Sequence, residues 1–387
     1  MEHHKELKGQ ALLFLLFLWF LWFCNLGVRV IFSPILPLVE DEFAVSHARA
    51  GSIFIFQSIG YGLSMFFSGF YSGRLGYKKS IVLSLLVSSS VCFLIPFVNV
   101  FSAFYLFSFV LGFSTGVYLP SVMPLITEYF DERNWGKSIA IHDSAASISI
   151  FSMPFLALFL LHFVKWRGIF EVFAVIFLLS AVLFYFTSDE LEIKHSEKTM
   201  LGDLVKRRSL WIMAVLWMFA AGANMGIYFI VPLYLTKELS LGIGYANTLL
   251  GVSRFGGIAV AILCGFLVDR FSLRKMIFMM VLLTGIFTVL MGVASVRYVG
   301  IFLFFQALVV TGFFPLGLVS MARMFSREVR GLATGLTLTI GVTCGGGLMP
   351  FFLGLSGDLL SFRFGISILG IAVILSSGLI FALREIK

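Results

Sequence analysis

Twelve long apolar segments, separated by short polar stretches, dominate the sequence. Each has at least the roughly 20 residues that a helix needs to cross the hydrocarbon core of a bilayer. Backbone polar groups in lipid must be satisfied internally, and the segments are continuously apolar rather than alternating, so helices are expected rather than barrel strands. The predicted spans are 11–38, 48–73, 80–99, 101–127, 138–162, 168–188, 210–236, 244–269, 276–295, 298–325, 331–357 and 363–383.

Composition excludes a water-soluble fold for this chain. Of its 387 residues, 59% are hydrophobic and only 12% are charged, whereas a soluble domain carries about 25% charged residues. The N-terminal apolar run continues past signal-peptide length without a clear small-residue cleavage site, so no cleaved leader is expected. We therefore expect the lipid bilayer to be the solvent of this protein.

The basic residues predict the orientation in the membrane. Most of the 28 lysines and arginines fall in segments on one side of the predicted spans. The positive-inside rule places that side, with both termini, in the cytoplasm. Topology thus accounts for the net charge of +8, and the scattered basic loops form no nucleic-acid-binding stripe. We expect a multi-pass cell-membrane protein that functions as a monomer and binds no nucleic acid.

The two halves of the chain repeat one another. The turn at 69–80 recurs at 265–276, and separated landmarks recur at an offset of 195 residues: Pro37 with Pro232, Pro120 with Pro315, and Gly136 with Gly331. A near-constant offset indicates duplication in the same order. The predicted organisation is an N-terminal six-helix bundle over 1–190, a charged cytoplasmic linker over 191–209 and a C-terminal six-helix bundle over 210–387.

The repeated turn resembles a motif of the major facilitator superfamily of secondary transporters, G-x-x-x-D-R-x-G-R-[KR] between helices 2 and 3. In the first copy Gly69, Arg74 and Gly76 match, while Gly73 replaces the acid. The second copy keeps Asp269 and Arg270. The resemblance implies an all-α membrane protein with twelve transmembrane helices in two parallel six-helix bundles around a central cavity.

The same turns are candidates for gating. Arginines at the inner ends of two helices can bond helix C-terminal carbonyls and interact favourably with the helix dipole. The alternative is that these basic residues only fix the topology. The candidate gating residues are Gly69, Arg74, Gly76, Asp269 and Arg270.

Two arginines within predicted spans point to the substrate. Arg29 and Arg254 each lie about four residues outward of the middle of a helix, or ~6 Å at helical rise. A charge at the membrane centre costs about 2.5–3.5 kcal/mol, and the arginine fork suits carboxylate or phosphate. The alternatives are pairing with carbonyls or Asp143, or snorkelling outward.

Further polar residues at similar depths complete the predicted substrate site. The duplication equates Arg29 with Asn224, which again marks a polar position on that helix. The remaining candidates are Asn25, Gln57, Tyr61 and Tyr228; the tyrosines, with Tyr118 and Gln306, are more often simply packed side chains.

His142 and Asp143 are candidates for proton coupling. Their counterparts in the second half are Thr337 and Leu338, so the pair is not part of the shared scaffold. A buried imidazole or carboxyl can carry a proton near neutral pH. The alternative is that Asp143 pairs with Lys137 or Arg133 at the membrane surface.

These features predict a secondary active transporter for a small solute, favoured to be a small organic anion, with a proton as a candidate co-substrate. The alternative is efflux of hydrophobic compounds, although the family's drug antiporters carry an arginine in helix 4 that the stretch 107–112 lacks. A non-transporting receptor or a membrane enzyme is a remote alternative. The four cysteines show no metal-type spacing, and no nucleotide-binding loop occurs, so no metal, cofactor or enzymatic activity is expected.

Overall fold

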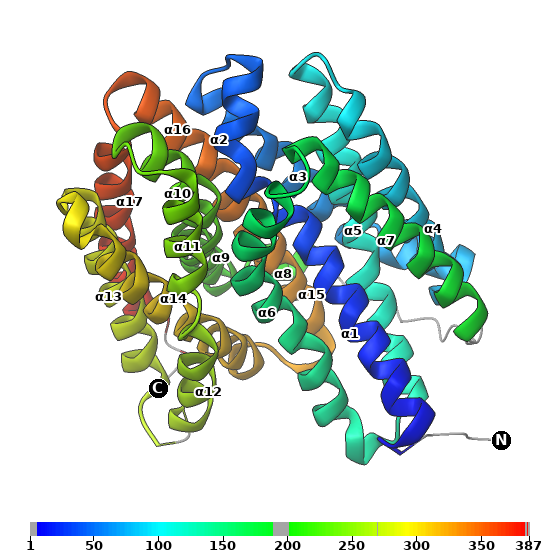
Figure 1. Cartoon of the computed structure of the whole chain (residues 1–387). Helices are drawn as coiled ribbons and strands as arrows, with labels where there is room; N and C mark the ends of the chain where they lie inside the picture. The colour runs from blue at the N-terminus through cyan, green and yellow to red at the C-terminus, as the bar shows by residue number, and fades with distance from the viewer. Residues whose placement is uncertain (1–5, 189–200, 269, 384, 386–387) are drawn as a thin grey trace. The chain divides into compact units, whose positions relative to one another are not determined.

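Long helices make up most of the computed structural model, which describes residues 6–188, 201–268, 270–383 and 385 (Figure 1). The helices of the first half are α1 (Gly9–Val30), α2 (Phe32–Phe43), α3 (His47–Phe66), α4 (Ser68–Leu94), α5 (Ser102–Tyr129), α6 (Trp135–Leu161) and α7 (Trp166–Thr187). Those that follow are α8 (Leu201–Val205), α9 (Arg208–Ala221), α10 (Ile227–Leu233), α11 (Ile243–Ser253), α12 (Gly257–Leu267), α13 (Leu273–Val293), α14 (Val296–Met324), α15 (Arg327–Ile340), α16 (Met349–Leu359) and α17 (Phe362–Ser377). Short helical turns of other types link several of them, including the π-helices η3 (Gly222–Gly226), η4 (Tyr234–Glu238) and η5 (Gly341–Leu348).

The helices follow the predicted spans closely. Within the described residues, ten helical segments are long and apolar enough to cross a membrane, the first being the joined α1 and α2 over Gly9–Phe43. The two predicted spans that are not among these ten are 48–73 and 244–269, where the helices are broken. α3 ends at Phe66 and α11 ends at Ser253. Both breaks therefore fall in the second predicted span of a repeat. The fold still has twelve membrane helices when these two interrupted helices are included.

The first basic turn is tighter than its sequence suggests. The chain reverses at the single residue Gly76, whose φ of 82° and ψ of 163° interrupt the helical run of α4. Side chains other than glycine are strongly disfavoured in that region of backbone space. Gly69 and Arg74 are consequently helical residues before the turn, whereas Lys78 and Lys79 begin the helix after it.

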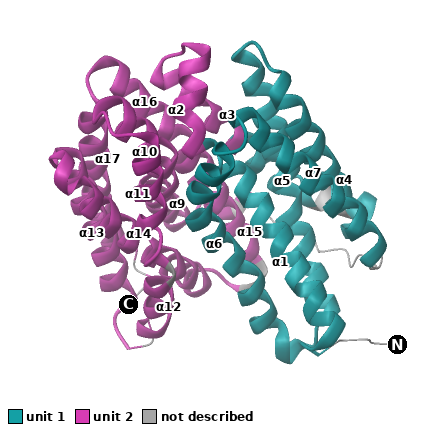
Figure 2. Cartoon of the chain, viewed as in Figure 1, with its two compact units in different colours: residues 1–32, 59–196 teal, residues 33–58, 197–387 magenta. Residues whose placement is uncertain are grey.

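Contacts divide the chain into two compact units (Figure 2). Unit 1 comprises residues 1–32 and 59–196, and unit 2 comprises 33–58 and 197–387. Unit 2 thus contains α2 and the first part of α3, although these belong to the first sequence repeat. The bundle boundaries at 190 and 209 describe the repeat rather than the contacts, and they stay a prediction.

Specific contacts hold the segment 33–58 within unit 2. The Asn247 side-chain amide donates to the Pro34 carbonyl at 3.0 Å, and the Phe54 ring stacks on that of Phe229 with centroids 4.0 Å apart. Gly51 packs so closely that a Cβ atom there would lie 2.5 Å from the carbonyl oxygen of Pro350. Small residues at helix crossings allow this approach of backbones.

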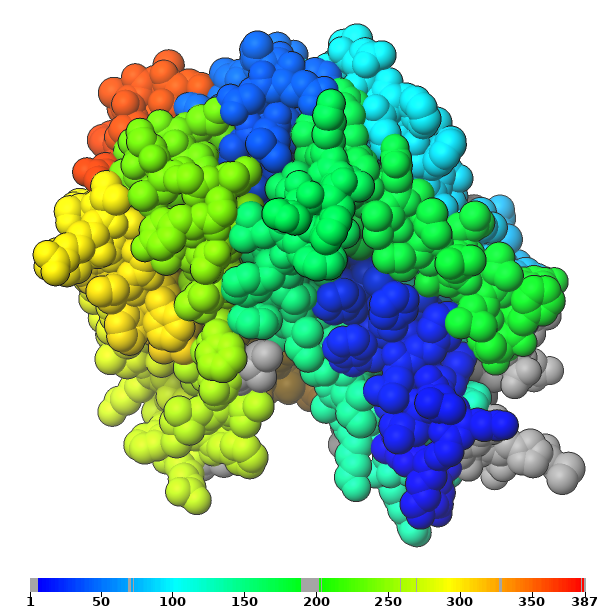
Figure 3. Space-filling view, in the orientation of Figure 1, coloured from blue at the N-terminus to red at the C-terminus, as the bar shows by residue number. Residues whose placement is uncertain are grey.

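Unit 1 is a layered helical assembly around aromatic side chains. Helix α1 contacts α6, α5 and α7, and it lies beside α6 and α7 in the space-filling view (Figure 3). Tyr118, Phe170 and Phe184 are fully buried between these helices. Many other large apolar side chains remain exposed on the molecule, as expected for a protein whose outer surface meets lipid rather than water.

Candidate functional site

The buried arginine of unit 2 lies at a helix break. α11 ends at Ser253, Arg254 occupies the C-cap position, and α12 begins at Gly257. A Cβ atom at Gly256 would lie 2.3 Å from the terminal Cδ1 of Leu308, so α14 packs closely against this break. Paired glycines are a common cause of such kinks. The break leaves Arg254 at the junction of two helices, where only 7% of the residue is exposed.

The partners of Arg254 come from a second distorted helix. Asn224 lies in the π-helix η3, and Arg254 Nη1 donates to its side-chain oxygen at 2.5 Å. Arg254 Nη2 donates to the Asn224 carbonyl at 3.2 Å, and the guanidinium carbon lies 5.0 Å from the centre of the Tyr228 ring. π-helical turns are frequent at functional sites. Two predicted substrate residues, Asn224 and Tyr228, thus meet Arg254.

The charge of Arg254 is not neutralised by an acid. Within the described ranges no carboxylate forms an ion pair with Arg254, and its Nε atom is buried without a hydrogen-bond partner. Guanidinium has five N–H donors, of which the two bonds to Asn224 use two. Arg254 is therefore a buried cation whose Nε–H has no hydrogen-bond partner among the described residues.

Gln306 of α14 supports the same distorted turn. Its side-chain amide donates to the Ala223 carbonyl at 2.7 Å, and the residue is fully buried. Gln57, also assigned to unit 2, is 3% exposed. Gln306 thus holds the backbone of η3 at the residue before Asn224. The spacing of residues in the sequence could not predict this contact.

Unit 1 contains a matching arginine–tyrosine pair. The Arg29 guanidinium lies 4.0 Å from the centre of the Tyr61 ring, a distance at which a cation is attracted to the aromatic face. Asn25, one helical turn before Arg29, is 1% exposed and donates to the Thr115 carbonyl at 3.0 Å. In the first repeat the arginine stands on the first helix, whereas in the second repeat it stands on the second helix.

His142 and Asp143 lie next to one another in the sequence but in different environments. His142 is fully buried, its Nε2 atom is 3.2 Å from the Tyr118 hydroxyl, and its ring stacks with Trp22. Asp143 is exposed. In the described part of the chain no ion pair joins Asp143 to Arg133 or Lys137, and the His142 Nδ1 atom has no hydrogen-bond partner.

The basic residues of the two turns make different contacts. Arg74 and Arg270 are both exposed, and Arg274 donates to the Leu383 carbonyl at 2.8 Å. Lys78 donates to the Ser188 carbonyl at 2.5 Å, which ties the first turn to the end of α7. Asp269 lies outside the described residues.

An ionic cluster in unit 2 was not predicted from the sequence. It joins the end of α2, the start of α3, η4, and the facing ends of α16 and α17; its members are Glu40, Asp41, His47, Lys237, Glu238, Asp358 and Arg363. His47 Nδ1 lies 2.8 Å from a Glu40 oxygen, Lys237 pairs with Asp41, and the Asp358 carboxylate accepts from the backbone N–H groups of His47 and Ala48 at 2.9 Å each. The available signal was a set of opposite charges at the ends of distant spans.

Metal-binding clusters are absent from the described residues. Of the four free cysteines, Cys24, Cys92 and Cys264 are buried, and Cys344 is half-buried. Dispersed, buried thiols of this kind behave as small apolar side chains.

Comparisons with known proteins agree with this architecture. The family model of the Major Facilitator Superfamily matches residues 18–266 and 218–386. The chain is 24% identical over 290 residues to the chloramphenicol resistance protein CraA of Acinetobacter baumannii, covering 69% of this chain and 67% of that protein. It is also 24% identical over 275 residues to the glycerol-3-phosphate transporter of Bacillus subtilis, covering 63% of this chain and 62% of that protein.

Solved structures share the fold at low sequence identity. A bacterial homolog of the human lysosomal transporter Spinster superposes with a TM-score of 0.83 at 13% identity, covering 98% of this chain and 99% of that one. A D-xylose–proton symporter superposes with a TM-score of 0.78 at 16% identity, covering 97% of this chain and 98% of that one. The family match spans nearly the whole chain: this multi-pass membrane protein belongs to the major facilitator superfamily and is a transporter, not an enzyme.

Proposed function

We propose that this transporter carries a small organic anion and that Arg254 binds it. The observation behind the proposal is a guanidinium that is 7% exposed, held by the amide and carbonyl oxygens of Asn224, with no carboxylate paired to it among the described residues. Burying an uncompensated charge is costly. An anionic substrate would supply the missing negative charge.

The geometry of Arg254 favours a carboxylate or phosphate. Asn224 contacts both Nη atoms, which fixes the plane of the guanidinium and leaves its Nε–H without a partner. A neighbouring pair of guanidinium N–H groups can bind two oxygens of one anion side by side. In a setting of low dielectric constant such charge-assisted bonds are stronger than in water.

Arg29 is a second candidate for the anion in unit 1. Its guanidinium is oriented by the Tyr61 ring, and Asn25 lies one helical turn away. The planar guanidinium of arginine matches the geometry of a carboxylate or phosphate. Variants of Arg29 therefore belong in the same experiment as those of Arg254.

The test is uptake of labelled carboxylates and organic phosphates by proteoliposomes. Arg254→Gln is expected to raise the apparent KM by on the order of tenfold or more, since a hydrogen bond to a charged group contributes about 1.5–3 kcal/mol. Arg254→Lys should recover only part of this loss, because lysine keeps the charge without the fork. Arg29→Gln and Arg29→Lys test the second arginine.

Arg297→Gln provides the matched control. Arg297 is exposed and contacts the neighbouring Tyr298 ring, so this change removes the same charge away from the proposed site. Unchanged substrate affinity in all four variants of Arg29 and Arg254, with normal folding, would reject an arginine-bound anion.

Efflux of hydrophobic compounds is the second candidate function. It is favoured by the similarity to a chloramphenicol resistance protein, whereas the similarity to a glycerol-3-phosphate transporter favours an anionic substrate. Chloramphenicol accumulation in cells expressing the protein distinguishes the two. Lower accumulation that is unaffected by Arg254→Gln would favour efflux.

We further propose that His142 and Asp143 couple transport to protons. His142 is buried against Tyr118 and Trp22, and its Nδ1 atom has no hydrogen-bond partner among the described residues. The next residue, Asp143, is exposed. Substrate-driven proton flux in liposomes should fall in Asp143→Asn and in His142→Gln, with Thr127→Val as a control outside the pair. Flux identical to wild type in both variants would remove the pair from the mechanism.

The gating and topology proposals are tested together. We propose that the turns containing Gly69, Arg74, Gly76, Asp269 and Arg270 stabilise one transport state, with both termini and the 191–209 linker in the cytoplasm. The double variant Arg74→Ala, Arg270→Ala should change turnover at normal expression, and reporters fused to each terminus should be active only in the cytoplasm. Wild-type turnover would reject the gating role, and a reporter active outside would reject the orientation.

A further inference from the structure

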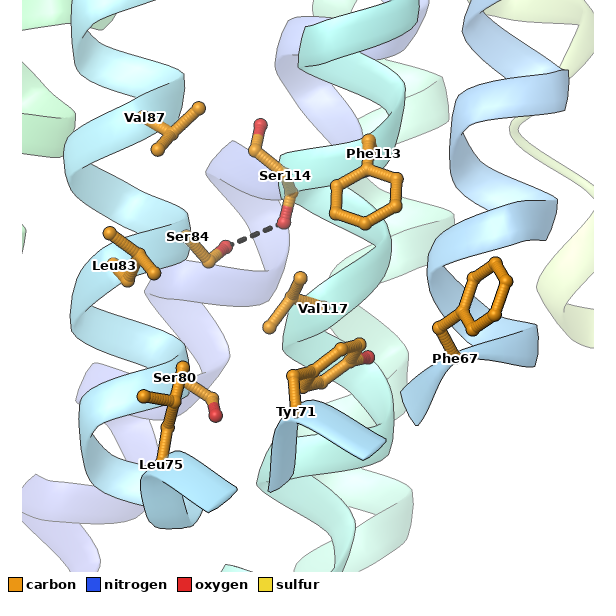
Figure 4. Close-up of a pocket in the computed structure, with 10 residues that line it drawn as sticks. All are labelled: Phe67, Tyr71, Leu75, Ser80, Leu83, Ser84, Val87, Phe113, Ser114 and Val117. Atoms are coloured by element: carbon orange, nitrogen blue, oxygen red, sulfur yellow. Dashed lines mark hydrogen bonds between the residues drawn. The ribbon is translucent and has the colours of Figure 1, made fainter. Parts of the chain in front are cut away.

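Unit 1 contains a cavity of about 330 Å³ beside the first basic turn. Its walls come from the residue that follows α3, from α4 on both sides of the Gly76 turn, and from α5 (Figure 4). Tyr71 and Leu75 line it before the turn, whereas Leu83 and Val87 line it after the turn and Val117 closes it from α5. The volume lies at the lower end of the range for small-molecule sites, about 300–1,000 Å³.

The cavity offers carbon rather than polar atoms to an occupant. Four hydroxyls lie in its wall: the Tyr71 hydroxyl is buried without a hydrogen-bond partner in the described part of the chain, and each of the three serine hydroxyls donates to a backbone carbonyl. Ser84 donates to Ser114 at 2.7 Å (Figure 4), Ser80 donates to Gly76 at 2.7 Å, and Ser114 donates to Leu111 at 3.0 Å. Because the serine donors are engaged within the helices, and the lining residues other than Tyr71 and the serines are hydrocarbon, an apolar chain is the occupant that suits most of the wall.

The rim of the cavity belongs to the outer, apolar surface of the protein. Phe67 is 47% exposed, Leu75 is 42% exposed and Leu83 is 50% exposed. In a membrane protein such side chains face the acyl chains of the bilayer. An acyl chain of a surrounding lipid can therefore enter the cavity directly from the bilayer.

Basic residues directly precede two of the lining residues in the sequence. Arg74 precedes Leu75, and Lys79 precedes Ser80; both basic residues are exposed. The half-buried Lys78 donates to the Ser188 carbonyl, and its Nζ atom lies 5.0 Å from the centre of the Tyr185 ring. Positive charge is thus next to the lining residues in the sequence, on both sides of the Gly76 turn, and an anionic lipid with its chain in the cavity would complement this charge.

We propose that this cavity binds one acyl chain of an anionic phospholipid whose phosphate lies against Arg74 and Lys79. The lipid would contact α4 before and after Gly76 and would also contact α5. It would therefore bridge the tight turn that joins two neighbouring membrane helices. The site lies wholly in unit 1, and its residues are not those proposed to bind the transported anion.

Photo-cross-linking in nanodiscs tests the site. The full-length protein is reconstituted in phosphatidylcholine with a trace of phosphatidylglycerol that has a photoreactive diazirine on one acyl chain, and labelled peptides are identified by mass spectrometry. We expect labelling of the segments that contain Leu83, Val87 and Val117. The double variant Arg74→Gln, Lys79→Gln should reduce labelling by about fivefold for each charge removed.

Two further arms identify what the site recognises. A phosphatidylcholine probe with the same chains should label the segments several-fold less, and excess inorganic phosphate should leave labelling by phosphatidylglycerol unchanged. Equal labelling by both lipids would overturn recognition of the anionic headgroup. Loss of labelling in excess phosphate would overturn the lipid assignment and indicate a free-phosphate site.

Filling the cavity provides an independent check. Val87→Phe and Val117→Phe should each abolish the cross-link at the cavity, whereas Val182→Phe, at a position of α7 that is 48% exposed and does not line the cavity, should not. Persistent labelling in folded Val87→Phe and Val117→Phe would overturn the proposal, as would labelling spread evenly over the exposed helices of wild type.

Discussion

The Ser33 hydroxyl donates a hydrogen bond of 2.6 Å to the backbone carbonyl of Tyr228, the residue 195 positions later and therefore its counterpart in the sequence repeat. Proline at position 232 has no N–H, so it cannot provide the intrahelical bond that the Tyr228 carbonyl would otherwise accept. Ser33 replaces that missing donor. Pro232 thus leaves the Tyr228 carbonyl without its intrahelical donor, and Ser33, the residue equivalent to Tyr228 in the first half, donates to it instead.

This contact predicts a specific pattern of stability. Ser33→Ala should lower the free energy of unfolding by about 1–3 kcal/mol, because it leaves a buried carbonyl without a partner. Adding Pro232→Ala should restore much of the loss, since alanine at 232 provides the intrahelical N–H. The midpoint of chemical unfolding in detergent measures both effects. Equal losses with and without Pro232→Ala would contradict this explanation.

Asn224→Asp should separate stability from substrate binding. The new carboxylate would take the place of the Asn224 amide, whose oxygen is 2.5 Å from Arg254 Nη1, and would neutralise the guanidinium. We expect anion affinity to fall by on the order of tenfold or more, while thermal stability is kept or increased. Ligand-induced thermal shifts measure both quantities.

Asn247→Asp is the control for that experiment. The Asn247 amide nitrogen donates to the Pro34 carbonyl in a fully buried setting, and a carboxylate cannot donate there. This variant should lose stability without a selective loss of anion affinity. If Asn224→Asp bound the anion as well as wild type did, Arg254 would not be the anion-binding group.

Two glycines of the first basic turn should respond oppositely to alanine. Gly76 has φ at 82°, so Gly76→Ala is expected to cost about 1–3 kcal/mol of stability. Gly73 is helical, and apart from its own stretch of helix nothing lies within 4 Å of the position of an added Cβ; Gly73→Ala should therefore stabilise by up to about 1 kcal/mol. Thermal unfolding of both variants provides the comparison, and a neutral Gly76→Ala would show that the turn tolerates other conformations.

The stability of the ionic cluster should depend on pH through His47, which is the first residue of α3 and precedes the predicted span. Its hydrogen bond to Glu40 raises the pKa of the imidazole above 6.5; burial and Lys237 oppose this, while the charges of Glu40 and Asp358 add to it. A raised pKa in the folded state contributes stability that is fully present below about 6.5 and is lost as pH rises through the folded-state value.

Thermal unfolding from about pH 5 to about pH 8, the range in which histidine titrates, measures this contribution. The wild-type midpoint should fall with rising pH relative to His47→Gln, which cannot gain the charge. Parallel profiles of the two proteins would contradict a role for His47 protonation. Glu40→Gln should flatten the profile in the same way, because it removes the carboxylate that lies 2.8 Å from the imidazole.

The sequence by itself determined the membrane environment, the twelve spans and the duplication. These properties depend on the length and apolarity of continuous segments and on a fixed repeat offset, all of which are local or periodic. It also identified Arg29, Arg254 and Asn224, since a charge or an amide in an apolar helix stands out without knowledge of its neighbours. Their roles in transport stay predictions.

Only the tertiary structure decided which of these polar groups meet. The break at Gly256 and the π-turn at Asn224 bring Arg254 and Asn224 together, and a contact between residues 30 positions apart on two different helices cannot be read from local propensity. The same is true of His47 and Asp358, which lie 311 residues apart, and of the contacts that place residues 33–58 in unit 2. Apolar length determines that a segment crosses the membrane, whereas close helix packing determines which side chains face one another.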